Sequence, residues 1–177
     1  MTNSRNYLHK YAMQFGTYIG IYWILKFILF PFALTIPFLS LLFLALTLII
    51  PFIGYYFVKT YRDKICRGAI SFGHAFFFTV LMYMFASLLV AIAHYAYFEY
   101  IDQGYVIESY TQIWNTMLTD TPSMEVNRQI IEEMIETAKT LKPIDITMQL
   151  LSWDVIFGTI LAFPTALVIM KKPTTNE

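Results

Sequence analysis

Four long apolar stretches dominate the pattern of hydrophobic and polar positions along the chain. They cover about residues 11–32, 37–58, 69–98 and 147–170. Each is long enough to cross a bilayer as a helix, because about 20 apolar residues at a rise of about 1.5 Å span a hydrocarbon core about 30 Å thick. The sequence therefore predicts an all-α membrane protein with four transmembrane helices, formed by residues 1–177 as a single membrane domain.

Prolines punctuate this pattern in two places. Pro31 and Pro37 bracket the short link between the first two stretches and disfavour one continuous helix through it, so we expect a tight hairpin there. Pro164 lies inside the fourth stretch, where the missing N–H predicts a kink.

The segment of about residues 99–146 is the one sizeable polar part of the chain. Apolar positions at i, i+3 and i+4 predict two amphipathic helices in it. The second is expected to start near Thr121, with Pro122 at its first helical position, and to end at Pro143. Each apolar face needs a cover, which is the other helix, the membrane surface or a protein partner.

The distribution of basic residues predicts the orientation. Eight Lys and Arg residues and two acids lie in the N-terminal segment, the turn between the second and third stretches, and the C-terminal segment. Residues 99–146 hold three basic and nine acidic residues. Because cytoplasmic loops of membrane proteins are enriched in Lys and Arg, we expect both termini in the cytoplasm (N-in/C-in) and 99–146 as an extracytoplasmic loop.

Composition supports a membrane location and excludes some kinds of site. The chain is 58% hydrophobic and 14% charged, against about 45–50% and about 25% in soluble domains. The formal net charge is zero, and no nucleic-acid partner is expected. Cys66 is the only cysteine, which excludes an intrachain disulfide and a cysteine-based metal site. No cleavage site follows Lys10, so we interpret the first stretch as a retained helix.

Two charged residues inside the apolar stretches are the main candidates for function, because charges in membrane spans are costly. Lys26 and Asp154 lie about 9 and about 10 Å from the outer ends of their helices at 1.5 Å per residue. This matched depth predicts an ion pair or a shared polar pocket, to which His94 could belong. The alternative is that the Lys26 side chain snorkels to the outer headgroups.

Small residues predict helix contacts rather than chemistry. Gly16 and Gly20 form a GxxxG pattern, and Gly158 and Ala162 follow Asp154 at i+4 steps. Packing within the chain is the expected use of these faces, with homo-oligomerisation as the alternative. No metal-ligand spacing, nucleotide-binding loop or nucleophile motif is present, so we predict no catalytic residue, cofactor or metal.

The layout also resembles a family. The short basic N-terminus before Tyr11, the Pro31–Pro37 link, the basic turn Lys59–Asp63 and the acidic loop at 99–146 carry the resemblance. They resemble an uncharacterised bacterial family of small four-helix inner-membrane proteins, a domain of unknown function. The resemblance implies an inner-membrane location and no assigned activity.

Two functions follow from these observations. The first is a non-enzymatic scaffold or accessory subunit of an envelope complex, in contact with the lipid bilayer and with a membrane-protein partner or a second copy. The second is a small transporter or lipid-processing enzyme with an outer-leaflet polar pocket at Lys26 and Asp154. The lack of a catalytic motif favours the first.

Overall fold

The computed structural model describes residues 2–120 and 128–172, and in these ranges the chain folds into helices. Apart from one isolated β-bridge, no strand forms in the described ranges. The helices are α1 (Thr2–Phe27), α2 (Phe30–Ala33), α3 (Pro37–Lys64), α4 (Phe72–Tyr100), α5 (Tyr105–Asp120), α6 (Arg128–Thr140) and α7 (Pro143–Ile169). Three of the described helices, α3, α4 and α7, are long and apolar enough to cross a membrane.

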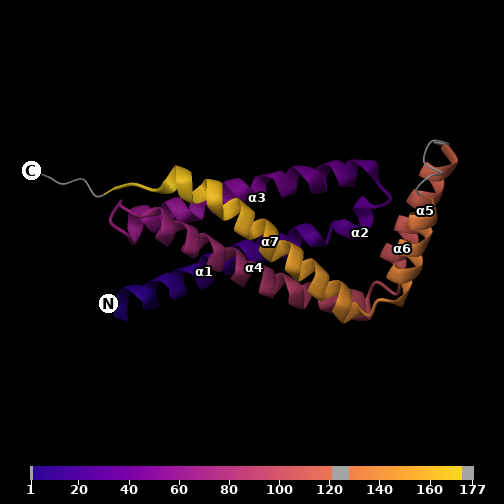
Figure 1. Cartoon of the computed structure of the whole chain (residues 1–177), viewed down its shortest axis with the longest axis horizontal. Helices are drawn as coiled ribbons and strands as arrows, with labels where there is room; N and C mark the ends of the chain where they lie inside the picture. Colours follow the sequence, from indigo (N-terminus) through magenta and orange to yellow (C-terminus); the bar gives the residue numbers. More distant parts are fainter. Residues whose placement is uncertain (1, 121–127, 173–177) are drawn as a thin grey trace, which may run out of the picture.

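The long helices α1, α3, α4 and α7 form a bundle, and α5 and α6 stand across one end of it (Figure 1). Helix α4 packs against both α1 and α7, and α3 contacts all three. Buried side chains recur along α4 from Ala75 to Phe98. The start of α1, the α3–α4 turn and the end of α7 lie at the end of the bundle opposite α5 and α6 (Figure 1).

Helix α1 lies against α4 through a stripe of small and aromatic residues. Ala12, Phe15, Ile19 and Trp23 are buried and follow the i, i+3, i+4 spacing of one helix face. Gly16 lies in the same face, where a Cβ atom would come within 2.6 Å of the Met82 carbonyl oxygen. The two backbones approach this closely because that position carries no side chain.

Tyr83 joins the four long helices at the middle of the bundle. Its side chain on α4 is fully buried and lies between Gly54 of α3 and Gly158 of α7, where an added Cβ would come within 2.0 Å of the Tyr83 Oη and 2.7 Å of its Cβ. The Trp23 ring of α1 stacks on it, with ring centroids 6.1 Å apart. We call these four residues, Trp23, Gly54, Tyr83 and Gly158, the tyrosine joint.

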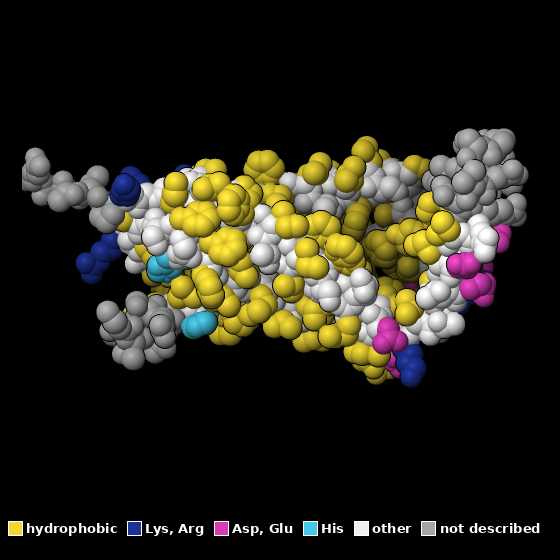
Figure 2. All heavy atoms as spheres, viewed as in Figure 1, with side chains coloured by type: hydrophobic (Ala, Val, Ile, Leu, Met, Phe, Trp, Pro, Cys, Tyr) yellow, Lys and Arg dark blue, Asp and Glu magenta, His cyan; other side chains and the backbone are white. Residues whose placement is uncertain are grey.

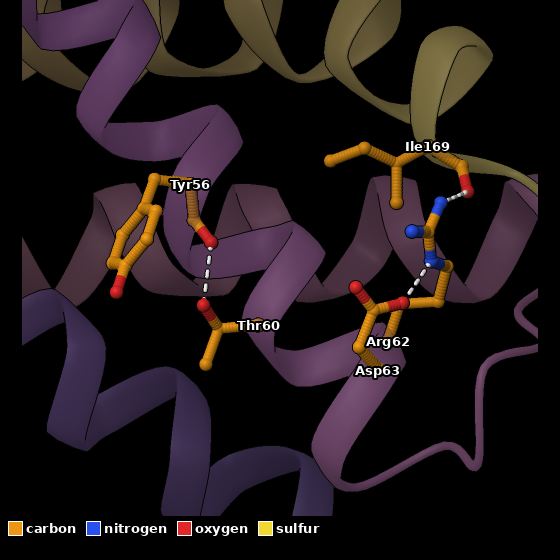
Figure 3. A network of polar contacts seen from close by, with 5 residues as sticks. All are labelled: Tyr56, Thr60, Arg62, Asp63 and Ile169. Carbon is orange, nitrogen blue, oxygen red and sulfur yellow. Dashed lines mark hydrogen bonds and ion pairs between the residues drawn. The ribbon is translucent and has the colours of Figure 1, made fainter.

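The end of the bundle opposite α5 and α6 carries Arg62, Lys64, Lys171 and Lys172, and we call it the basic end. Polar contacts connect the helices there (Figure 3). The Arg62 guanidinium of α3 donates to the Ile169 carbonyl at 3.1 Å and pairs with Asp63 at 2.7 Å. A cation at a helix C-terminus is favourable because the last carbonyls carry partial negative charge. Ile70 and Lys171 exchange two backbone hydrogen bonds of 3.0 and 2.9 Å, so the α3–α4 turn is fastened to the end of α7.

The first predicted span differs from the structure. Helix α1 ends at Phe27 instead of near residue 32, and Pro31 stands in the first turn of the separate helix α2, since its missing N–H is tolerated there. Helix α1 is not among the three helices that are apolar enough to cross a membrane. It carries Lys10, Gln14 and Lys26, which lower its mean hydropathy.

The other predicted spans differ from the helices by up to six residues, the largest difference being the end of α3, which is at Lys64 and not near residue 58. Helix α3 begins at Pro37 as expected, and α7 begins at Pro143, four residues before the predicted span, where the Asp145 carboxylate accepts the Lys142 N–H at 3.1 Å. The expected helix start at residues 121 and 122 lies outside the described residues, and α6 is described from Arg128. Helix α7 continues past Pro164 to Ile169, and the kink there stays a prediction.

Candidate ligand cavity

A cavity of about 740 Å³ lies among the long helices and extends to α5 and α6. All four long helices and the α5–α6 pair contribute to its wall. We call it the hairpin cavity. Figure 2 shows the hollow between the bundle and the α5–α6 pair, with hydrophobic side chains around it. Its volume lies within the roughly 300–1,000 Å³ of small-molecule binding sites.

The turn between α4 and α5 places the α5–α6 pair over this end of the bundle. Gln103 and Gly104 adopt positive φ, at 46° and 89°. The buried Asp102 carboxylate accepts the N–H groups of Gly104 and Val106, both at 3.1 Å, and so satisfies free donors of the first turn of α5. Val106 is buried and lines the cavity. Helix α5 is therefore fixed at its start, directly beside the cavity.

Lys26 is held at the wall by α3. Its ammonium donates to the Thr47 hydroxyl at 3.2 Å and lies 4.7 Å from the centroid of the Phe43 ring. Both contacts hold the Lys26 ammonium against α3. The side chain therefore does not extend to the membrane surface. The Thr47 hydroxyl donates to the Phe43 carbonyl at 2.8 Å, which leaves its lone pairs for the lysine.

His94 supplies a second polar group from α4. Its side chain is 7% exposed and lines the cavity. The imidazole packs at an angle against the Phe27 ring, with centroids 4.3 Å apart, and its Nδ1 atom is buried with no hydrogen-bond partner. A buried polar atom without a partner costs free energy.

Asp154 supplies a carboxylate from α7. The residue is half-buried and lines the same cavity. The ion pairs of the described residues include Arg62–Asp63 and Lys139–Glu136 but none between Lys26 and Asp154, whose charged atoms stay more than 4.0 Å apart. The sequence suggests either an ion pair or a shared pocket for Lys26 and Asp154. In the structure their side chains line one cavity without touching each other. A cation, a carboxylate and an imidazole thus face one largely apolar space.

The small residues singled out by the sequence have structural contacts. Gly16 and Gly20 lie against Met82, Ala86 and Leu89 of α4, and Gly158 lies against Tyr83. Ala162 is fully buried. Phe43 and Thr47 also contact Lys26, and the sequence does not single them out. The only signal at Thr47 is a hydroxyl in a stretch free of charge, and Phe43 gives none.

A second cavity, of about 710 Å³, lies at the basic end. Its wall contains the Tyr61 hydroxyl and His74 Nε2, which are 3.0 Å apart, and the thiol of Cys66. Burial raises the pKa of the Cys66 thiol. In the part of the chain that the structure describes, no group of three or more His, Cys, Asp and Glu residues is placed to hold a metal ion.

Comparison with known proteins identifies a family. The family described as a protein of unknown function (DUF4199) matches residues 14–171. No curated protein and no solved structure matches the chain. Because the match covers most of the sequence, the chain belongs to this family, and its function must be inferred from its own residues.

Proposed function

We propose that this member of the DUF4199 family is a multi-pass membrane protein that binds a lipid-like amphipathic molecule in the hairpin cavity. The observation that carries the proposal is the wall itself, which is apolar except for a few polar groups. Lys26, His94 and Asp154 lie in it without contacting one another. Pockets for amphipathic ligands combine an apolar lining with a few polar groups that fix the head of the molecule.

The cavity opens toward the surface that would face lipid. Leu48 of α3 and Phe157 and Ile160 of α7 line it and are 62%, 56% and 59% exposed. Since α3 and α7 are membrane-length apolar helices, a gap between them leads sideways into the bilayer. An acyl chain can therefore lie between α3 and α7 while its polar head stays inside.

We propose α1 as the fourth span. It packs along α4, which has membrane length, so the two helices share the same depth. Several of its outward side chains are also apolar, since Met13, Ile21 and Leu25 are 53%, 47% and 60% exposed, and the exposed Gln14 and Thr17 side chains hydrogen-bond within the helix. A helix with buried contacts on one side and apolar side chains on the other suits a hydrocarbon surrounding.

In this arrangement the basic end lies in the cytoplasm of a bacterial inner membrane, and α5 and α6 lie on the far side. The last turn of α3 carries Arg62 and Lys64, and the segment that follows α7 carries Lys171 and Lys172. The opposite end carries the acidic α5–α6 segment. The hairpin cavity then opens in the outer half of the bilayer.

Cys66 gives a test of this orientation, because it is the only cysteine and lies in the α3–α4 turn. Its raised pKa leaves little thiolate near neutral pH, so alkylation should be slow and should accelerate as the pH rises. We expect a membrane-impermeant maleimide to label Cys66 in inside-out vesicles and not in spheroplasts. In a Cys66→Ala background, Lys139→Cys should label only in spheroplasts. Labelling of Cys66 from outside would contradict the orientation.

Filling the cavity tests the binding function. Leu150 lies in the cavity wall one turn before Asp154, so Leu150→Trp should occupy ligand space and lower the amount of lipid retained through purification by at least about tenfold. Ile156→Trp is the matched control, because Ile156 is on the same helix, 47% exposed and outside the cavity wall. Lipid retained per protein is measured by mass spectrometry after delipidation in mild detergent.

The scaffold function is a second candidate, supported by a different observation. On α6, Ile130 and Met134 are 57% and 66% exposed beside acidic side chains. An apolar patch on a polar segment suits a protein partner. Equal lipid retention by the Leu150→Trp and Ile156→Trp variants would leave the scaffold function as the better account.

A further inference from the structure

We propose that the head bound in the hairpin cavity is zwitterionic, with a phosphate at Lys26 and a primary ammonium at Asp154, as in an aminophospholipid. The inference rests on the proposed function and adds the class of ligand. It starts from two opposite charges that share one wall without pairing, at N···O distances above 4.0 Å. Two unpaired charges in an apolar space are costly, and a ligand that pairs with both removes the cost.

The phosphate site is at Lys26. An ammonium has three N–H donors, and the described protein groups take one of them, through the Thr47 hydroxyl at 3.2 Å. The Phe43 ring lies against the same group at 4.7 Å and holds it in place. Two donors remain for a phosphate oxygen, and a charge-assisted hydrogen bond of this type is about twice as strong as a neutral one.

The ammonium site is at Asp154. A carboxylate accepts hydrogen bonds at two oxygens and donates none, and no described protein group donates to it. A primary ammonium brings three donors as well as a positive charge. A quaternary ammonium brings the charge alone, so it should bind Asp154 less well.

The two charges together select against other heads. An anionic lipid pairs with Lys26 but leaves Asp154 buried and repelled, and a purely cationic amphiphile does the reverse. Lys26 and Asp154 cancel each other in net charge, so a head of zero net charge keeps the cavity neutral. His94, which is 7% exposed with an unpartnered Nδ1, adds a further polar group to the same wall.

The test compares three lipids with identical acyl chains. Delipidated full-length protein in detergent is titrated with phosphatidylethanolamine, phosphatidylcholine or phosphatidylglycerol, and bound lipid is counted by native mass spectrometry. We expect the wild type to prefer phosphatidylethanolamine to phosphatidylglycerol by about tenfold, which is about 1.4 kcal/mol. Phosphatidylcholine should fall between them. Equal binding of the three lipids would overturn the inference.

Two variants assign the preference to its residues. Asp154→Asn should abolish the preference for phosphatidylethanolamine over both other lipids. Lys26→Met should weaken the binding of all three lipids by about tenfold. Glu99→Gln and Lys139→Met remove charges from exposed helix positions outside the cavity and should bind as the wild type does. An unchanged preference in Asp154→Asn contradicts the assignment, provided that its melting temperature matches the wild type.

The Leu150→Trp variant separates failure of this inference from failure of the proposed function. If Leu150→Trp removes lipid binding but the wild type shows no preference among head groups, the proposed function stands. The inference that the ligand is an aminophospholipid is then wrong. Lipid binding that Leu150→Trp does not affect refutes both.

Discussion

Gly54→Ala is expected to destabilise the bundle by about 1–3 kcal/mol, the usual cost of overpacking a core, and Tyr83→Phe is expected to recover about half of the loss. The added Cβ would come within 2.0 Å of the Tyr83 Oη and 2.9 Å of its Cζ. The tyrosine ring is fully buried in the tyrosine joint and has no space to move aside. Removing the Tyr83 hydroxyl takes away the closest contact of the added Cβ. The contact with the Tyr83 Cζ at 2.9 Å remains.

Tyr83→Phe alone should change stability little, because its hydroxyl is buried without a hydrogen-bond partner. Gly158→Ala should also be destabilising, but Tyr83→Phe should not recover it, since the closest atom there is the Tyr83 Cβ at 2.7 Å. Gly73→Ala is the control, as nothing lies within 4 Å of its added Cβ. Melting temperatures in detergent give the comparison. Equal recovery at both glycines would show that the tyrosine joint is packed differently.

Gly16→Ala is expected to have the second large effect, a loss of about 1–3 kcal/mol from overpacking, by forcing α1 away from α4. The added Cβ meets the Met82 carbonyl oxygen at 2.6 Å and the Phe85 Cβ at 2.8 Å. Both atoms are fixed to the backbone of α4, so the helices themselves must separate.

Gly20→Ala should cost less than Gly16→Ala. The atom nearest its added Cβ is the Leu89 Cδ2 at 2.9 Å, the end of a flexible side chain. The same melting experiment ranks the two variants against Gly73→Ala. A Gly20→Ala variant less stable than Gly16→Ala would contradict the contact between α1 and α4 described here. If Gly16→Ala behaved like Gly73→Ala, the close approach of the two helices would be wrong.

Much of the fold follows from apolar spacing. The pattern predicted the start of α3 at Pro37 and long helices over most of α4 and α7, because a membrane-length apolar run and a proline at the first turn are local signals. It placed the end of the first helix about five residues too late, since the run of apolar residues continues through Pro31 into α2. Hydrophobicity alone does not distinguish a helix from an apolar turn.

The cavity could be predicted only in part. The matched depths of Lys26 and Asp154 placed them in one layer, because depth follows from position along a helix. Their separation depends on how α1 and α7 are rotated about their axes, which helix packing decides. The Thr47 hydroxyl that holds Lys26 comes from α3, and no spacing in the sequence links residues on two different helices. The α5–α6 pair over the cavity depends likewise on the turn at Asp102.

The central claim, a lipid-like molecule in the hairpin cavity, is tested most directly by counting lipids on the Leu150→Trp and Ile156→Trp variants side by side. The two substitutions add the same side chain to the same helix, one inside the cavity wall and one outside it. The account predicts that Ile156→Trp keeps the wild-type amount of tightly held lipid while Leu150→Trp loses it. Equal amounts on both variants, at equal melting temperatures, would contradict the claim.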